Sequence, residues 1–144
     1  MEGIIGYRSD VAYTIRFDDS DKGRQTFEIF LADAKQNEAT KNAFKDSEGD
    51  EPSLIVDMVK RQINFHTEYA KWVTDYPDVK CHDALLMLAS EYVDEMEMEK
   101  GGSACMGYIF YRIGEELNDI DEQYGGDYDW QWLGVSRSIV TDWD

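Results

Sequence analysis

Residues 105–129 read CMGYIFYRIGEELNDIDEQYGGDYD, and this stretch decides the fold that we expect. Its first nine residues, Cys105–Ile113, are almost all apolar or aromatic, and Arg112 is the only charged one. Such a run of β-branched and aromatic side chains predicts a strand that is buried on both faces of a sheet. From Gly114 onward the stretch carries seven acidic residues and no Lys or Arg. We therefore expect a buried strand that leads directly into a negative surface segment.

The length and composition of the chain limit what it can be. A chain of 144 residues fits one domain that buries roughly two-thirds of its unfolded surface. Hydrophobic residues make up 42% of it, which is enough core material to exclude disorder of the whole chain. The formal net charge of −17 favours basic partners and opposes direct binding to nucleic acid or to a membrane.

The acidic charge is concentrated in the second part of the chain. Residues 1–80 carry 11 basic and 16 acidic side chains, a net charge of −5. Residues 81–144 carry 3 basic and 15 acidic side chains, a net charge of −12. Uniform acidity would indicate only solubility or salt adaptation, whereas this asymmetry indicates a directed electric field and therefore a function.

The sequence predicts a cytoplasmic protein. Two cysteines, Cys81 and Cys105, cannot build a disulfide framework. The N-terminus shows no charged and then apolar leader, and no apolar run approaches the roughly 18 residues of a membrane span.

The first half of the chain predicts a strand, a helix and a hairpin. Alternating apolar residues indicate a strand over Val11–Phe17, and the residues just before it indicate a bulge or turn. After a loop with capping side chains, helical spacing predicts one helix over Lys22–Phe44. The short apolar run Phe27–Leu31 also fits a strand, although the Ala-, Lys- and Gln-rich continuation favours the helix. Ser53–Val73 then predicts a hairpin that turns at Lys60-Arg61.

The second half predicts another helix and two more strands. A helix should run from about Val79 to about Lys100, with its apolar stripe facing a sheet. The buried strand Cys105–Ile113 follows, then an acidic loop, and a short strand over Val135–Val140 closes the chain. This order predicts one α+β domain over residues 1–144, a ferredoxin-like βαββαβ sandwich with an extra C-terminal strand.

Three groups of short segments carry a resemblance to a known group of proteins. They are GYRSDV at residues 6–11, KW and YPDV at residues 71–72 and 76–79, and YRIGEE with SRSI at residues 111–116 and 136–139. With these segments the chain resembles small, mostly uncharacterised accessory proteins of tailed bacteriophages. The resemblance implies phage origin and a role in the cytoplasm of the infected cell. It implies no reaction and no catalytic residues.

We expect no metal ion and no other cofactor. The candidate zinc ligands are His66, Cys81, His82 and Cys105, but their spacing matches none of the usual zinc patterns. The pairs Asp119/Asp121 and Asp127/Asp129 suggest calcium, yet an EF-hand loop that starts at Asp119 has its glycine one place late and Trp130 where Glu is required. An irregular site for a divalent ion stays open as an alternative.

We also expect no enzymatic activity. Glu115 and Glu116 are adjacent and would point apart on a strand, and Ser136 and Ser138 have no identifiable base. The sequence contains neither a G-x-S-x-G motif nor a glycine-rich phosphate loop. Residues that are distant in the sequence could still converge, so the missing motifs favour a binding protein without excluding an enzyme.

The remaining signal is an acidic segment with interleaved aromatic residues, which predicts a surface that binds a partner. Carboxylates spaced along such a surface can occupy a groove that normally holds DNA phosphates, while aromatic side chains anchor the contact. The residues that we expect to bind the partner are Glu91, Asp94, Glu95, Glu97, Glu99, Glu115, Glu116, Asp119, Asp121, Glu122, Asp127, Asp129, Trp130 and Trp132.

These features lead to one functional hypothesis and one alternative. The hypothesis is an inhibitor in an anti-defence or host-takeover role, which binds a basic, nucleic-acid-handling host protein by mimicking nucleic acid. The alternative is a virion or assembly protein whose acidity serves only solubility. The sequence is also compatible with a homo-oligomer.

Overall fold

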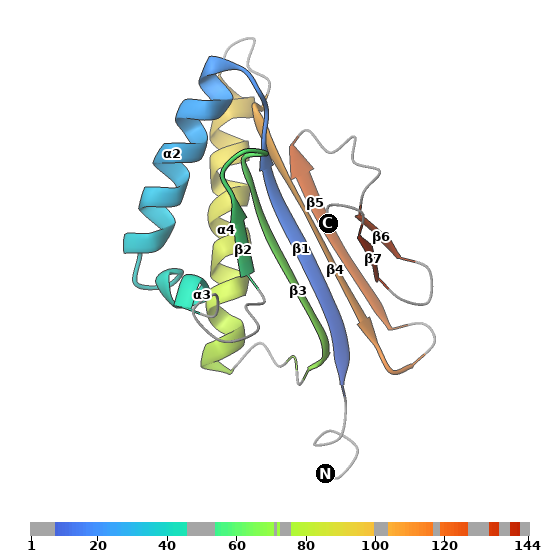
Figure 1. Cartoon of the computed structure of the whole chain (residues 1–144). Coiled ribbons are helices and arrows are strands. Elements are labelled where there is room, and N and C mark those ends of the chain that lie inside the picture. The colour runs from blue at the N-terminus through green and yellow to red at the C-terminus, as the bar shows by residue number, and fades with distance from the viewer. Residues whose placement is uncertain are drawn as a thin grey trace.

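The structure, a computed structural model, describes residues 8–45, 54–70, 72, 76–99, 104–116, 119–126, 133–135 and 139–141. Most of the strands form one sheet, and the helices pack on one of its faces (Figure 1). The elements are β1 (Ser9–Phe17), α2 (Asp21–Gln36), α3 (Lys41–Lys45), β2 (Leu54–Asp57), β3 (Gln62–Ala70), α4 (Pro77–Met98), β4 (Met106–Gly114), β5 (Ile120–Gly126), β6 (Leu133–Val135) and β7 (Ile139–Thr141).

The main sheet has five strands in the order β2-β3-β1-β4-β5, and every neighbouring pair is antiparallel. The first four strands have the order of a ferredoxin-like sandwich, in which a hairpin strand separates two strands joined through a helix. The fifth strand, β5, extends the sheet beyond β4. This arrangement confirms the predicted α+β, ferredoxin-like class with an extra strand.

The strand β1 lies at the centre of the sheet and supplies much of the core. Its residues Val11, Tyr13, Ile15 and Phe17 alternate along the strand and are completely buried against the helices. Tyr13 lies between Phe65 of β3 and Phe110 of β4 in the strand register. A shift in the β1–β3 register follows Ser9, which confirms the bulge predicted at the start of this strand.

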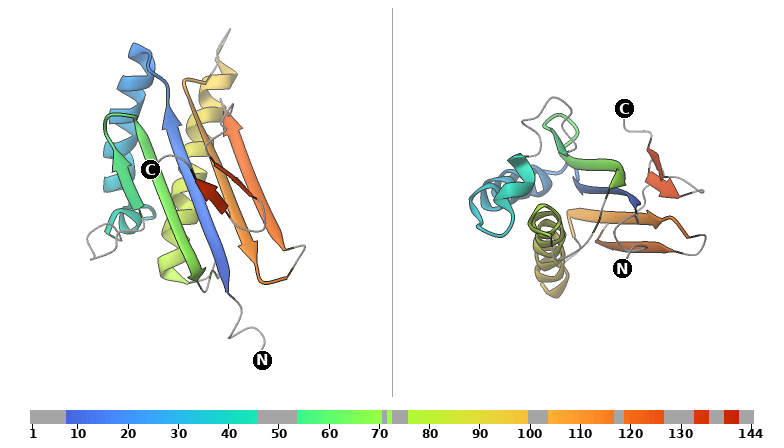
Figure 2. Two further views of the ribbon diagram at one scale, coloured as in Figure 1. Left: turned by 45° about the vertical axis from the view of Figure 1, so that its right-hand side comes forward. Right: turned by 90° about the horizontal axis from the view of Figure 1, so that it is seen from below.

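The opposite face of the sheet is polar near its centre yet also buried. Thr14 of β1 donates a hydrogen bond of 2.5 Å to the side-chain carbonyl of Asn64, and the Asn64 amide donates to Gln62. Burial of these polar groups is tolerated because each has a hydrogen-bond partner. The hairpin of β6 and β7 lies on this face, away from the helices (Figure 2).

The strand β4 lies between β1 and β5, as expected for the stretch Cys105–Ile113. Its first half is largely buried, and Ile109 and Phe110 are each 6% exposed on opposite faces. Phe110 and Arg112 face α4, because both line a pocket with residues of that helix. The predicted alternation along this strand is therefore confirmed.

The helix α2 begins at a capped N-terminus and packs on β1. The hydroxyl of Ser20 accepts a hydrogen bond from the backbone N–H of Gly23, which satisfies one of the free donors of the first turn. Phe27 and Phe30 contact the ring of Phe17 at centroid distances of 5.2 and 5.5 Å. The run 27–31 is thus helical, and the strand alternative is wrong.

The prediction of one helix over Lys22–Phe44 is wrong at its C-terminal end. α2 stops at Gln36, and the separate short helix α3 follows. Asn37 has an extended backbone, and its side-chain carbonyl accepts a hydrogen bond from the backbone of Ala39. The Thr40 hydroxyl donates to the carbonyl of Ala34. Such local side-chain bonds compete with helical ones and end the helix.

The second long helix, α4, starts two residues earlier than predicted, with Pro77 in its first turn. Proline is tolerated there because the first-turn N–H groups have no helical partner. Leu85, Ala89, Val93 and Met96 of the predicted stripe are buried, with Leu88 and Tyr92 packed beside them. The stripe is confirmed, and its contacts hold α4 against α2 and the sheet.

A phenol–carboxylate hydrogen bond joins the two long helices and leads to a pH-dependence prediction. The Tyr92 hydroxyl donates to Asp33 of α2 at 2.9 Å. Burial of the phenol, followed by this hydrogen bond and the charge of Asp33, raises the pKa of Tyr92 to about 12. The folded protein therefore keeps this proton at pH values where the unfolded chain, with its ordinary pKa of about 10, has lost it.

We expect the stabilising contribution of Tyr92 to be complete below pH 10 and to be lost as the pH rises toward 12. Urea unfolding of the wild type and of Tyr92→Phe between pH 9 and pH 12 measures this directly. The difference in unfolding free energy between the two proteins should shrink over that range. Tyr76→Phe, at the exposed start of α4, serves as the control. Parallel curves for wild type and Tyr92→Phe would contradict the assignment.

Two predictions for the C-terminal part of the chain are wrong. The segment after β4 is not only a loop, because Ile120–Gly126 forms β5 at the edge of the sheet. Ile120 lies opposite Ile113 and Tyr124 lies opposite Ile109, so apolar pairs support this acidic strand. Strand-forming residues near 133–141 pair with each other as β6 and β7, and no single strand over Val135–Val140 joins the main sheet among the described residues.

Candidate functional site

The last three turns of α4 carry a dense set of exposed acidic side chains. Within this stretch Val93 and Met96 face the core, and the carboxylates face away from it. The exposed residues are Glu91, Asp94, Glu95, Glu97 and Glu99, which we call the α4 acidic surface. Within the described residues its one ion pair is the solvent-exposed contact of 3.7 Å between Lys22 and Glu99.

The position of these carboxylates on the helix strengthens their negative field. No basic residue lies in the last turn of α4, and the C-terminal end of a helix carries a partial negative charge of its own. The carboxylates therefore add to this dipole although they destabilise the helix slightly. The arrangement favours the approach of a cationic surface toward this end of the molecule.

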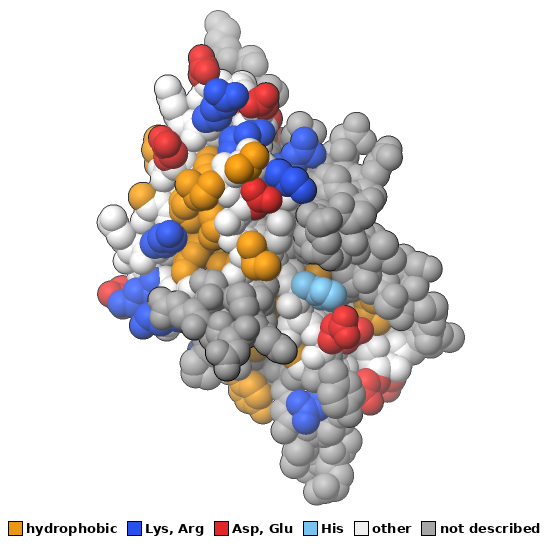
Figure 3. Space-filling model, in the orientation of Figure 1, with side chains coloured by type: hydrophobic (Ala, Val, Ile, Leu, Met, Phe, Trp, Pro, Cys, Tyr) orange, Lys and Arg blue, Asp and Glu red, His pale blue; other side chains and the backbone are white. Residues whose placement is uncertain are grey.

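Basic side chains lie on a neighbouring face at the same end of the molecule. Asp19 contacts Arg24 at 2.6 Å and Arg61 at 3.8 Å, which brings the start of α2 next to the β2–β3 turn. These partners, Arg24 first, lower the pKa of Asp19. The face in Figure 3 accordingly shows Lys and Arg side chains gathered near its top, above a band of exposed apolar side chains. Among the described residues, the acids at the end of α4 and the basic side chains at the start of α2 therefore lie on neighbouring faces at this end.

The acids of the β4–β5 connection lie at the other end of the protein. Met96 of α4 contacts Cys105 just before β4 begins, whereas Asp83 lines a pocket with Arg112 near the end of β4. α4 and β4 therefore run in opposite directions, and the turn after Gly114 lies beyond the N-terminal half of α4. The structure does not bring the expected residues of this turn, Glu115 and Glu116, to the α4 acidic surface.

Three of the expected carboxylates are held by contacts within the chain. Glu115 accepts a hydrogen bond from the backbone N–H of Arg8. The guanidinium of Arg112 donates to both oxygens of Asp119, to Asp121 at 2.8 Å and to the Ser9 hydroxyl at 3.0 Å. The hydrogen bond to Asp119 is the largest cause that raises the pKa of Arg112. Because one cation is shared between two carboxylates, Arg112 offsets one of their two negative charges, and this group adds less to a long-range negative field than two unpaired acids would.

The remaining expected residues divide between the opposite face of the sheet and the undescribed part of the chain. Glu122 lies between Asp121 and Gln123, which both face α4, so alternation places it on the other face of β5. There it lies opposite Tyr111, whose pKa is raised by burial and then by the charge of Glu122. Four expected residues lie outside the described residues: Asp127, Asp129, Trp130 and Trp132.

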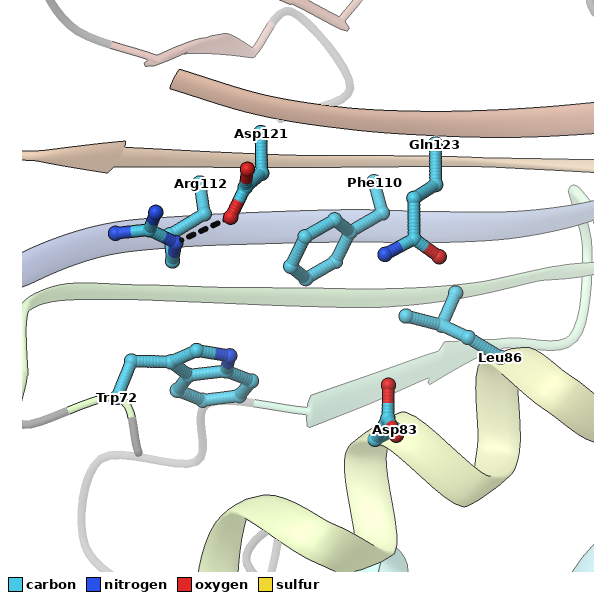
Figure 4. Close-up of a pocket in the computed structure, with 7 residues that line it drawn as sticks. All are labelled: Trp72, Asp83, Leu86, Phe110, Arg112, Asp121 and Gln123. Atoms are coloured by element: carbon cyan, nitrogen blue, oxygen red, sulfur yellow. Dashed lines mark hydrogen bonds and ion pairs between the residues drawn. The ribbon is translucent and has the colours of Figure 1, made fainter. Parts of the chain in front are cut away.

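A pocket of about 400 Å³, which the sequence analysis did not predict, lies between the N-terminal half of α4 and the strands β4 and β5. Its wall combines apolar and polar side chains from four separate parts of the chain (Figure 4). The lining residues are Trp72, Asp83, Leu86, Phe110, Arg112, Asp121 and Gln123. Part of this set was predictable from the sequence. If residues 112–123 are interpreted as a hairpin, Arg112, Asp121 and Gln123 lie on neighbouring strands.

A buried aromatic cluster supports one side of the pocket. His82 is 1% exposed, and its Nδ1 lies 2.7 Å from the hydroxyl of Tyr13, which is completely buried. The His82 ring packs at 4.2 Å from Phe65 and 5.8 Å from Trp72. His82 therefore has a structural role in this core, where it fixes Trp72 at the edge of the pocket.

The candidate metal ligands are not gathered in one place. Cys105 donates its thiol toward Met96 and Thr26, while His82 bonds with Tyr13. Within the ranges that the structure describes, no group of three or more His, Cys, Asp or Glu side chains is placed to hold a metal ion. None of the helices in those ranges has the length and apolar character needed to cross a bilayer.

Comparisons of the chain with protein-family models, with curated proteins and with solved structures found no match.

Proposed function

We propose that the protein is a non-catalytic phage accessory protein that binds and inhibits a basic, nucleic-acid-handling protein of the host. The α4 acidic surface would make the contact, with its carboxylates in the place of nucleic-acid phosphates. The observation that carries the proposal is the exposure of five carboxylates within nine residues, four of them on the last turns of α4 and the fifth, Glu99, at its C-cap. The segments that resemble phage accessory proteins support the expected setting, the cytoplasm of an infected host cell.

The spacing of these charges supports nucleic-acid mimicry. The six residue steps from Glu91 to Glu97 span about 9 Å of helix axis, since each residue of an α-helix rises by about 1.5 Å. The four carboxylates on this length are separated by three intervals, which gives about one charge per 3 Å. One strand of duplex DNA carries a phosphate about every 3.4 Å. A groove of Lys and Arg that accepts a DNA strand would therefore meet a similar linear density of charge on this helix.

We restrict the proposed mimicking surface to fewer residues than the sequence analysis named, because the named acids lie in different places. Glu115 and Glu116 lie at the other end of the molecule, and Arg112 offsets one of the two charges of Asp119 and Asp121. The proposal therefore rests on the α4 acidic surface. The role of Trp130 and Trp132 as aromatic anchors is still a prediction. A basic groove of the partner should approach α4 from the side opposite the sheet.

We expect the triple variant Glu95→Lys, Glu97→Lys, Glu99→Lys to associate with the partner at least about tenfold more slowly at low salt, because a long-range field sets the association rate. The matched control reverses Glu28, Glu38 and Glu68, which are exposed on other elements and give the same change in net charge. Single neutralisations should each have small effects, since exposed charge pairs are typically worth less than about 1 kcal/mol.

The measurement begins with capture from a host lysate on the immobilised protein, followed by elution in a salt gradient. Captured proteins should be basic and nucleic-acid-binding, and duplex DNA should compete for them. Association rates of a purified partner with the two triple variants then test the surface, with circular dichroism to check folding. An unchanged rate for the α4 variant, or recovery of only acidic partners, contradicts the proposal. Fixed stoichiometry in purified virions would instead support the assembly alternative.

A further inference from the structure

The pocket between α4 and the strands β4 and β5 has a rigid apolar wall. Leu86 is 4% exposed and Phe110 is 6% exposed, so both side chains are held by the surrounding core. Trp72 is partly buried, and its ring packs at 5.7 Å from Phe65 as well as against His82. Figure 4 shows Leu86 and Phe110 pointing into the space between the helix and the strands, with Trp72 across from Arg112. An apolar or aromatic body of a small ligand fits such a wall.

Arg112, the one cationic side chain among the described residues that line the pocket, is already used within the protein. All three guanidinium nitrogens of Arg112 donate to Asp119, Asp121 or Ser9. An anionic ligand would have to break these charge-assisted bonds, which are stronger than neutral ones. The pocket is therefore unsuited to phosphate, sulfate or carboxylate groups.

Among the described side chains that line the pocket, the charge that remains is negative. Asp83 projects from α4 toward the pocket, and its carboxylate makes no hydrogen bond or ion pair with any residue that the structure describes (Figure 4). Asp121 accepts from Arg112 through one oxygen, which leaves acceptor capacity on its carboxylate. With Asp119 included, three carboxylates face one guanidinium, a net charge of −2. Gln123 adds an amide that can also accept a hydrogen bond.

We propose that this pocket binds an organic cation, an ammonium or guanidinium group carried on an apolar body. The cationic group lies between the carboxylates of Asp83 and Asp121, and the apolar body packs on Leu86, Phe110 and Trp72. The aromatic face of Trp72 also attracts a cation that lies over it. This chemistry can come from a free arylalkyl amine or from a basic side chain of a protein.

The pocket is separate from the α4 acidic surface, so this proposal does not depend on the proposed function. Asp83 and Glu97 are 14 residues apart on α4, which corresponds to about 21 Å along the helix axis. A variant at Asp83 therefore changes the pocket and leaves the acidic surface intact. The two proposals can fail independently.

The test is an NMR titration of the full, ¹⁵N-labelled chain with 2-phenylethylammonium at low salt. The indole N–H signal of Trp72, assigned with Trp72→Phe, should shift and saturate. The neutral analogue 2-phenylethanol should bind at least about tenfold more weakly, because it lacks the charge that the carboxylates attract. Equal binding of the alcohol and the ammonium, or no saturable shift for either, would overturn the proposal.

Two aspartate variants on the same helix provide the matched comparison. Asp83→Asn should weaken binding of 2-phenylethylammonium by about tenfold, since it removes one charge-assisted contact. Asp94→Asn, an exposed aspartate outside the pocket, should change the dissociation constant less than about twofold. Similar effects of the two substitutions would mean that only the general field of the protein attracts the probe, which would also overturn the proposal.

A second probe distinguishes the two sources of the cation. N-acetyl-arginine N-methylamide carries a guanidinium on a peptide-like body. If it binds at least as tightly as 2-phenylethylammonium and with the same dependence on Asp83, the site takes a basic side chain of a protein. If it binds more weakly than the amine, the site takes a free small molecule. Either order supports the organic-cation site, provided that Asp83→Asn weakens binding.

Discussion

The substitution Phe30→Ala is expected to lower the free energy of unfolding by about 3–5 kcal/mol, the usual cost of replacing a buried phenylalanine with alanine. Phe30 is completely buried in α2. Its ring lies 5.5 Å from Phe17 of β1 and 5.0 Å from Tyr92 of α4, so one side chain joins both long helices to the central strand. The truncation leaves a cavity where these three elements meet, and neighbouring side chains can fill it only in part.

The adjacent residue provides a matched control for this prediction. Ile29 lies on the same helix and is 62% exposed. Ile29→Ala should change stability by less than about 0.5 kcal/mol, because it removes little buried surface and alanine favours the helix. Urea unfolding followed by circular dichroism gives both values. Comparable losses for the two variants would show that α2 does not pack through Phe30 as described.

The substitution Gly126→Ala is expected to cost about 2–4 kcal/mol, because the backbone and the space around this glycine both exclude a side chain. Gly126 has a φ of +75°, a left-handed conformation that alanine adopts only with strain. A Cβ at this position would overlap the carbonyl oxygen of Met106 and approach Val93 of α4 to 3.1 Å. Relief of this overlap requires β4 and β5 to separate at the end of the sheet.

Gly125 provides the control for this prediction. It separates the strain of a left-handed backbone from the effect of replacing any glycine with alanine. A Cβ at Gly125 would meet the end of the Tyr108 ring at 2.8 Å, a side chain that can shift, and its φ is not left-handed. Gly125→Ala should therefore cost about 1 kcal/mol or less. Thermal and urea unfolding of both variants give the comparison. Equal losses would mean that the left-handed backbone of Gly126 is not the source of the effect.

The sequence predicted those elements whose signal is local. The alternation of Val11, Tyr13, Ile15 and Phe17 reports one buried strand face, because side chains of a strand alternate between its faces. The apolar stripe of α4 is equally local, since its spacing follows the turns of a single helix. For the same reason the charge count along residues 91–99 was enough to predict an exposed acidic helix end.

The same sequence signals failed where contacts between distant segments decide the structure. The segment 120–126 looked like a loop because it combines two acids with two glycines, yet Ile120 and Tyr124 find apolar partners on β4. Helical spacing continued past Gln36, but the side chains of Asn37 and Thr40 bond to the local backbone and end the helix. Both outcomes depend on which hydrogen bonds are available, and composition does not show that.

The sequence by itself determined the α+β class, the place of β4 inside the sheet and the acidity of the end of α4, because each follows from periodicity or charge within one segment. Only the tertiary structure decided which charges act together. It placed Arg112 against Asp119 and Asp121, and it put Glu115 far from Glu99. It also formed a pocket from Trp72, α4 and the last two strands of the sheet. Side chains that meet across a pocket come from segments far apart in the chain, and their distance is set by packing of the whole core.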